Sequence, residues 1–139
     1  MYCAKVLVVD DSPTMRQFIV FALQRLPHLL IDEAGDGVSA LKQLSSVKYD
    51  LLLTDINMPM MDGLKLVSLI RNDVNYRQLP IVMITTEGSE VTREKALSLG
   101  ANEYITKPLQ TARLLDIVRK LLDPERRPGE ASVGLDSSL

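Results

Sequence analysis

The chain has very little cysteine: Cys3 is the only one among 139 residues, so no disulfide can form within the chain. A single thiol is typical of proteins in a reducing compartment, and Cys3 precedes the first predicted strand, where we expect it to be unreactive. The chain also has no basic N-terminal segment leading into an apolar one, and no apolar run approaches the ~20 residues that span a bilayer. These absences predict a cytoplasmic protein without a membrane partner.

A strong excess of charge is absent as well. The formal net charge is −2, and charged residues make up 24% of the chain. This balance gives no reason to expect direct binding to nucleic acid or to an anionic membrane surface. Hydrophobic residues make up 46%, which is ordinary for a globular domain.

Residues 1–122 contain no internal repeat and no low-complexity tract, and their number suits a single folded domain. Residues 123–139 differ, because they lack periodicity and are rich in proline, glycine, serine and charged residues. Such a composition is typical of segments that do not build a packed core. We therefore expect a domain over 1–122, followed by a flexible tail or the start of a linker over 123–139.

Short apolar runs alternate with segments of helical periodicity along the domain. Runs of this kind are typical of strands that are buried on both faces of a parallel sheet. The predicted strands are Val6–Val9, Leu29–Ile31, Leu51–Leu53, Ile81–Ile84 and Glu103–Thr106, and the predicted helices cover about 13–26, 38–44, 64–71, 87–99 and 110–122. The alternation predicts an α/β fold, a doubly wound five-stranded parallel sheet flanked by five helices.

Polar residues follow several of these strands at the point where each strand ends. Asp10 and Asp11 follow the first strand, Asp55 the third, Thr85 the fourth and Lys107 the fifth. In open α/β sheets the ligand site lies outside the carboxyl ends of the strands, so we expect these side chains to converge. Three carboxylates, a hydroxyl and an ammonium suit a divalent cation and a phosphoryl group, since Mg²⁺ prefers oxygen ligands.

Several motifs around these residues occur in a fixed order along the chain. They are Val8–Arg16, Asp36–Gly37, Thr54–Gly63, Ile84–Glu87 and Gly100–Pro108. With them the chain resembles the receiver domain of two-component response regulators, and especially the CheY-like single-domain chemotaxis regulators, over about residues 4–122. The resemblance implies the flavodoxin-like, CheY-like form of the doubly wound fold.

The resemblance also implies a metal site. Asp55 would be the phosphoacceptor, and Asp10 and Asp11 would hold Mg²⁺ together with Asp55 and the backbone carbonyl of Asn57. Mn²⁺ would be able to substitute for Mg²⁺. The chemistry agrees, because a bare carboxylate would repel a phosphoryl donor unless a cation offset its charge.

Further residues would bind the phosphoryl oxygens, again by resemblance. The Lys107 ammonium and the Thr85 hydroxyl would each contact one oxygen, and Thr86 would contribute its backbone N–H. The bond between Lys107 and Pro108 is expected to be cis. The chain would not be an enzyme in the usual sense, since it would catalyse only its own phosphorylation and autodephosphorylation.

The resemblance implies signalling through a packing switch. A sensor histidine kinase would phosphorylate Asp55, and Thr85 and Tyr104 would then rearrange together. The face formed by the fourth helix, the fifth strand and the fifth helix would bind a downstream protein or a second copy of the chain. The alternative for Tyr104 is a half-exposed strand residue without a switching role.

The predicted output face departs from that of the flagellar-motor regulators, which is usually basic and partly aliphatic. The fourth helix carries several acidic residues, and the last helix has an apolar arc wider than one core-facing stripe requires. The excess at Leu115, Ile117 or Leu122 indicates a surface for a partner or for self-association. The flagellar motor is therefore disfavoured as the target.

Two other functions fit part of the pattern. A phosphohydrolase of the haloacid dehalogenase type also uses an aspartyl phosphate, but its nucleophile belongs to an Asp-x-Asp pair after the first strand. Here Asp10 and Asp11 are contiguous, and the best acceptor follows the third strand. The second alternative is the receiver half of a larger regulator, divided in the linker that 123–139 would represent.

Overall fold

The computed structural model describes residues 3–124, so the tail or linker predicted over 123–139 lies outside the described residues from residue 125 onward. Within 3–124, no helix is both long and apolar enough to cross a membrane. Strands and helices alternate along the chain: β1 Ala4–Val9, α1 Pro13–Leu23, β2 Leu29–Ala34, α2 Gly37–Ser46, β3 Leu51–Thr54, α3 Gly63–Arg71, the 3₁₀ helix η1 Val74–Tyr76, β4 Ile81–Thr85, α4 Glu90–Leu99, β5 Glu103–Thr106 and α5 Thr111–Leu122.

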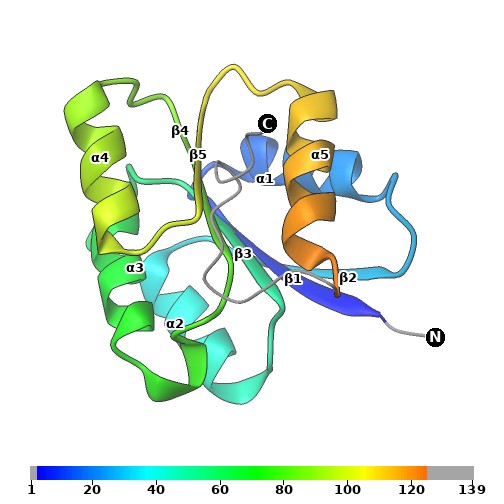
Figure 1. Ribbon diagram of the computed structural model, residues 1–139, viewed down its shortest axis with the longest axis horizontal. Helices are drawn as coiled ribbons and strands as arrows, with labels where there is room; N and C mark the ends of the chain where they lie inside the picture. Colours follow the sequence, from blue (N-terminus) through cyan, green and yellow to red (C-terminus); the bar gives the residue numbers. More distant parts are fainter. Residues whose placement is uncertain (1–2, 125–139) are drawn as a thin grey trace, which may run out of the picture.

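All five strands are parallel, in the order β2-β1-β3-β4-β5, and the predicted flavodoxin-like fold is confirmed (Figure 1). The chain starts at β1, moves outward to β2, and then returns to the other side of β1. The switch point therefore lies between β1 and β3, which is where open α/β sheets bind ligands. Val9 pairs with Thr54, so the residues that follow these two strands lie side by side.

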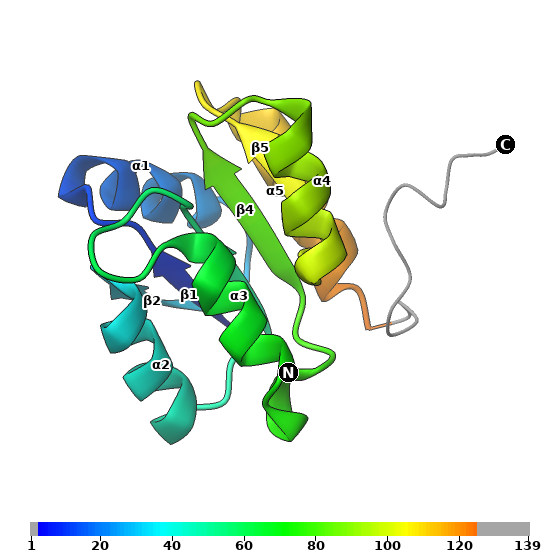
Figure 2. The same cartoon turned by 90° about the vertical axis from the view of Figure 1, so that its left-hand side faces the viewer.

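Helices cover both faces of the sheet, α1 and α5 on one and α2, α3 and α4 on the other (Figures 1 and 2). Every residue of β3 and β4 is buried, which explains why these central strands are apolar without alternation. The side chains that face α1 and α5 pack around Val8, Leu53 and Ile84, whereas those that face the other helices pack around Leu7, Leu52 and Met83.

Side-chain caps start four of the helices close to the carboxyl end of the preceding strand. The oxygens of Ser12, Asp36, Asp62 and Ser89 each accept a hydrogen bond from the backbone N–H three residues later. These bonds satisfy N–H groups that a helix leaves unpaired at its start. Gly100, at φ 120°, ends α4 as the sequence predicts.

Three element boundaries differ from the predicted ones by three residues, and the other differences are smaller. α1 ends at Leu23, where a turn over 24–26 replaces the helix expected to continue to Pro27. β2 continues through Asp32 and Glu33 to Ala34, because an edge strand can turn charged side chains towards solvent. α4 begins at Glu90 rather than at Glu87.

The apolar arc of α5 does not form an exposed surface, so that part of the sequence interpretation is wrong. Leu115 and Ile117 are 6% and 4% exposed and belong to the same core cluster as Val118. Leu122 is partly buried against that cluster. The reason is that α5 packs against α1 as well as against the sheet, so a wider arc of the helix is covered.

Candidate functional site

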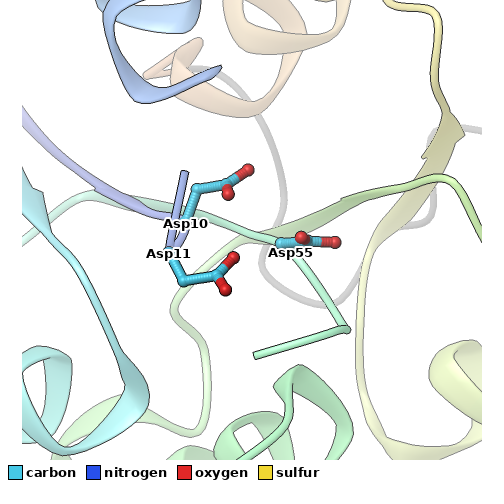
Figure 3. A group of neighbouring side chains, drawn as sticks. All are labelled: Asp10, Asp11 and Asp55. Atoms are coloured by element: carbon cyan, nitrogen blue, oxygen red, sulfur yellow. The ribbon is translucent and has the colours of Figure 1, made fainter. Parts of the chain in front are cut away.

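Three carboxylates converge at the carboxyl ends of β1 and β3. One oxygen from each of Asp10, Asp11 and Asp55 lies within 4.8 Å of the others, and Figure 3 shows the side chains reaching into the same space. Asp10 and Asp55 are 1% and 7% exposed, whereas Asp11 is exposed to solvent. The convergence predicted from the strand ends is confirmed for these residues.

Asp10 is held through four of its polar atoms. Its N–H donates to the Ala34 carbonyl at 3.2 Å, which continues the pairing of β1 with β2. Its carboxylate accepts from the Ser12 N–H at 2.9 Å on Oδ1 and from Lys107 Nζ at 3.2 Å on Oδ2. Its carbonyl accepts from Arg16 Nη1 at 2.6 Å. The Asp10 carboxylate therefore has a fixed orientation before any ligand arrives.

Asp55 is fixed by the backbone around it. Its N–H donates to the Val9 carbonyl at 3.0 Å, and its Oδ1 accepts from the Ile56 N–H at 2.7 Å. Gly63 packs so closely on this segment that an added Cβ would lie 2.1 Å from the Asp55 carbonyl oxygen. Only glycine allows α3 to begin against the Asp55 backbone in this way.

Lys107 brings a single ammonium to the three carboxylates. Its Nζ lies 3.2 Å from Asp10 Oδ2 and 3.5 Å from Asp55 Oδ2, and its backbone N–H donates to the Thr85 carbonyl at 2.8 Å. The bond between Lys107 and Pro108 is cis, as the resemblance implies. One ammonium does not offset three carboxylates, so the donor set suits a hard divalent cation with oxygen ligands.

The other predicted phosphoryl and metal residues surround this cluster. Thr85 is the last residue of β4 and is fully buried, and its Oγ1 accepts from the Glu87 N–H at 3.1 Å. This bond leaves the hydroxyl hydrogen of Thr85 available for donation. Thr86 and Asn57 are exposed in the loops after β4 and β3, and within residues 3–124 neither takes part in the hydrogen bonds that hold the carboxylates.

Tyr104 lies inside the molecule, so the half-exposed alternative is wrong. The residue is 3% exposed, and its hydroxyl donates to the Glu87 carbonyl. Burial raises the pKa of Tyr104, and the nearby negative charge of Glu87 raises it further. Because Glu87 also donates its N–H to Thr85, a single residue connects the two predicted switch residues.

Three residues shape the site although the sequence does not connect them with the carboxylates: Ser12, Arg16 and Gly63. Ser12 and Arg16 act on Asp10 through backbone groups, which no side-chain pattern shows. A glycine directly before a helical segment is the available signal for Gly63, and the sequence predicts Asp62 and Gly63 as a turn and helix start without relating them to Asp55. Arg16 lies one helical turn after the cap residue Ser12, where a side chain can reach back to the strand end.

Comparisons with known proteins agree with this arrangement. The family model of the response regulator receiver domain matches residues 6–119. Chemotaxis protein CheY1 of Helicobacter pylori is 47% identical over 105 residues, which cover 75% of this chain and 85% of that protein. The chemotaxis protein CheY homolog of Campylobacter jejuni is 41% identical over 128 residues, with 91% and 98% covered.

Solved structures are similar over most of the described residues. Chemotaxis response regulator CheY4 of Vibrio cholerae superposes with a TM-score of 0.80 at 34% identity and covers 86% of this chain and 99% of that one. The receiver domain of the sensor histidine kinase PA1611 from Pseudomonas aeruginosa has a TM-score of 0.78 at 29% identity, with 86% and 98% covered. That structure has a magnesium ion coordinated in its active-site cleft.

Proposed function

The chain belongs to the response regulator receiver domain family, and from this premise we propose that Asp55 is the residue that receives the phosphoryl group. The protein is a receiver of a two-component signalling system. Receivers of this family interact with histidine kinases and downstream targets, and they bind Mg²⁺ at an acidic site. One observation carries the assignment: Asp55 is a buried carboxylate at the switch point, facing Asp10, Asp11 and Lys107.

Transfer to Asp55 is an in-line displacement. A carboxylate oxygen of Asp55 forms a bond to phosphorus while the bond from phosphorus to the histidine nitrogen of the kinase breaks. The imidazole leaves with the bonding electrons and takes a proton from solvent. The hydrogen bond from the Ile56 N–H keeps the carboxylate of Asp55 in one orientation throughout this step.

The excess of negative charge is the main obstacle to this reaction. Asp10, Asp11 and Asp55 would hold Mg²⁺, or Mn²⁺ in its place, with the backbone carbonyl of Asn57 as a further ligand. The bound cation supplies positive charge that attracts the phosphoryl oxygens and lowers the repulsion between donor and acceptor.

Three other groups bind the phosphoryl oxygens. Lys107 exchanges part of its contact with Asp10 and Asp55 for one oxygen, and Thr85 donates its free hydroxyl hydrogen to another. The backbone N–H of Thr86 donates a hydrogen bond to a third phosphoryl oxygen. These residues promote the phosphorylation and dephosphorylation of the chain itself and act on no separate substrate.

The switch passes through Glu87. If the Thr85 hydroxyl turns towards a phosphoryl group, the hydrogen bond that it accepts from the Glu87 N–H is weakened. Because the Glu87 carbonyl accepts a hydrogen bond from Tyr104, a movement of Glu87 also changes the position of Tyr104. Tyr104 borders a groove of about 430 Å³ between α4 and α5, which Arg93 and Arg113 also line. We propose this α4–β5–α5 face as the site for the downstream protein or a second copy of the chain.

The remaining expectations from the sequence stand as proposals. The receiver covers 1–122, residues 123–139 form a tail or linker, and the protein acts in the cytoplasm. The family match gives no support to a phosphohydrolase of the haloacid dehalogenase type, and it gives no support to a larger regulator either.

Intact-mass measurement after incubation with acetyl phosphate tests the assignment of Asp55. The unmodified chain should gain one phosphoryl group with Mg²⁺ and none without it, and Asp55→Asn should gain none. Asp116→Asn is the matched control, because Asp116 is an exposed carboxylate on α5 that pairs only with Arg119 in the described residues. It should behave like the unmodified chain. A phosphoryl group on Asp55→Asn would show that the acceptor is another residue.

A further inference from the structure

Arg16 joins two strands and a helix beside the acidic cluster. It lies in the first turn of α1, and its guanidinium reaches back to the end of β1. Nη1 donates to the Asp10 carbonyl at 2.6 Å, and Nε donates to Glu33 Oε1 on β2 at 3.1 Å. The loop after β2 is also close, since a Cβ on Gly35 would lie 3.4 Å from Nη1. Both hydrogen bonds come from the same planar guanidinium, so each bond restricts the orientation of the other.

The hydrogen bond from Arg16 to the Asp10 carbonyl also restricts the position of Asp11. The Asp10 carbonyl and the Asp11 N–H belong to the same planar peptide unit, so fixing the carbonyl fixes the backbone direction into Asp11. Asp10 has three other hydrogen bonds that orient it. Among the described residues, the exposed carboxylate of Asp11 makes no hydrogen bond or ion pair. Its place in the cluster therefore depends on the backbone that Arg16 holds.

The charge of Arg16 acts in the opposite direction. A guanidinium beside the three carboxylates would repel an incoming divalent cation. Glu33 offsets this charge, because its carboxylate pairs with Nε, and its 42% exposed side chain lies on the solvent side of Arg16, which is 20% exposed. The pair can therefore hold the backbone without adding net charge to the site.

We propose that Arg16, held by Glu33, is a positioning residue for the divalent cation, and that it acts through the Asp10 carbonyl to place the Asp11 carboxylate. The inference rests on the proposed function, because it concerns the same acidic site. Groups that orient metal ligands typically change metal affinity about tenfold or more when they are removed. Arg16 would contact neither the cation nor the phosphoryl group, so we expect its substitution to change the affinity for Mg²⁺.

Calorimetric titration of the full chain with Mg²⁺ tests this inference. We expect Arg16→Lys and Arg16→Met to bind Mg²⁺ about tenfold more weakly than the unmodified chain, since neither side chain keeps the two fixed N–H donors. Lysine keeps the positive charge, so weakening in that variant reports position and not charge. Arg119→Met is the matched control, because it removes an exposed arginine that pairs with Asp116 on α5. It should leave Mg²⁺ affinity unchanged.

A second measurement separates positioning from general stability. Urea unfolding without Mg²⁺ reports the fold alone, and a purely structural role would lower stability while leaving the affinity for Mg²⁺ intact. At saturating Mg²⁺, the rate of phosphorylation of Arg16→Lys by acetyl phosphate should return close to that of the unmodified chain. If the Arg16 variants do not fold, Glu33→Asp carries the test, because the shorter side chain releases Nε while Nη1 remains and the negative charge is kept, and a smaller loss of Mg²⁺ affinity is expected.

The outcomes distinguish this inference from the proposed function. An Arg16→Lys variant that binds Mg²⁺ as tightly as the unmodified chain overturns the positioning role. Tighter binding by Arg16→Met also overturns it, since the charge of Arg16 would then be its dominant effect. An unmodified chain that binds no Mg²⁺ would instead contradict the proposed function of the acidic site.

Discussion

Polar side chains gather at both ends of the sheet, but they are paired in opposite ways. At the carboxyl end, Asp10, Asp11 and Asp55 share the ammonium of Lys107. At the amino ends of β4 and β5, the guanidinium of Arg71 donates to several uncharged acceptors. It donates to the Gly100 carbonyl at 3.0 and 2.8 Å, to the Tyr76 carbonyl at 2.9 Å and to Asn102 Oδ1 at 3.1 Å.

Two tyrosines, the buried Tyr49 and the partly buried Tyr76, make further hydrogen bonds towards the amino end. The Tyr76 hydroxyl donates to the Leu44 carbonyl at 2.7 Å, at the end of α2. The Tyr49 hydroxyl donates to Asp32 Oδ2 at 2.6 Å. Burial raises the pKa of both hydroxyls, and the Asp32 carboxylate raises that of Tyr49 further. Both hydroxyls therefore remain donors at neutral pH.

From this difference we expect the amino end to contribute mainly to stability and the carboxyl end, under the proposed function, to the binding of Mg²⁺. Hydrogen bonds at the amino end connect α2, α3, α4 and the starts of two strands, and they leave their donors satisfied. At the carboxyl end, like charges are held together by the backbone, Lys107 offsets their repulsion in part, and a bound divalent cation would relieve the rest. Substitutions at the two ends should therefore change different properties.

The largest expected effect comes from Gly63→Ala, which tests the backbone that supports the carboxyl end. The new methyl group would overlap the Asp55 carbonyl oxygen and lie 2.9 Å from Ile56 Cα, neither of which can move freely. We expect the free energy of unfolding to fall by more than about 4 kcal/mol in urea titrations. Gly88→Ala is the control, since its Cβ would make only a 3.7 Å contact with Thr106 Cγ2. Equal stability of the two variants would contradict the close packing on Asp55.

Arg71→Met tests the amino end and should have the next largest effect. The substitution removes both Arg71 donors from the Gly100 carbonyl and one donor from the Tyr76 carbonyl, so we expect a loss of about 3 kcal/mol in the free energy of unfolding. Mg²⁺ affinity, measured by titration calorimetry, should be unchanged because the acidic cluster lies at the other end of the sheet. Arg77→Met, at an exposed arginine in the same region, should change neither quantity. A clear loss of Mg²⁺ affinity in Arg71→Met would contradict the separation of the two ends.

The same contrast explains how much of the site the sequence predicts. Residues that directly follow parallel strands must meet at one edge of the sheet, so the convergence of Asp10, Asp55 and Lys107 follows from the strand assignment. The contacts of Arg16 and Gly63 do not follow, because they are made to backbone atoms whose positions depend on loop conformation.

For the fold, the sequence predicts burial correctly where the residues of a single element are sufficient to indicate it. The central strands β3 and β4 are apolar because both of their faces are covered, and a single run of residues shows this. The burial of Leu115 and Ile117 depends on the position of α1, and the inward position of Tyr104 depends on its bond to Glu87. Neither neighbour can be deduced from the periodicity of one segment.

Asp11→Asn tests the repulsion at the carboxyl end and should have a smaller effect. Without Mg²⁺, loss of one of three close carboxylates should raise the free energy of unfolding by about 0.5 kcal/mol, since Asp11 is exposed and screened. With saturating Mg²⁺ the order should reverse, because binding stabilises the unmodified chain more. Asp62→Asn is the control: it removes an equal charge outside the cluster, and asparagine caps α3 as well as aspartate does. A destabilised Asp11→Asn without Mg²⁺ would contradict the repulsion.

Glu103→Gln should give the smallest effect, and it extends the comparison to a carboxyl group at the start of β5 that belongs to neither network. Burial raises the pKa of Glu103 above its usual value, although Arg113, Lys120 and Arg93 act in the other direction. The folded protein therefore holds this proton more tightly than the unfolded chain. The resulting stabilisation is complete below the unfolded pKa of about 4.5 and is lost as the pH rises through the folded pKa. Glutamine stays neutral, so Glu103→Gln should be more stable than the unmodified chain at pH 7 by less than about 0.5 kcal/mol, because the carboxyl is half-exposed. At pH 3 the difference should vanish in thermal unfolding, whereas a Glu103→Gln variant that is less stable than the unmodified chain at pH 7 would show that the three cationic side chains dominate over burial.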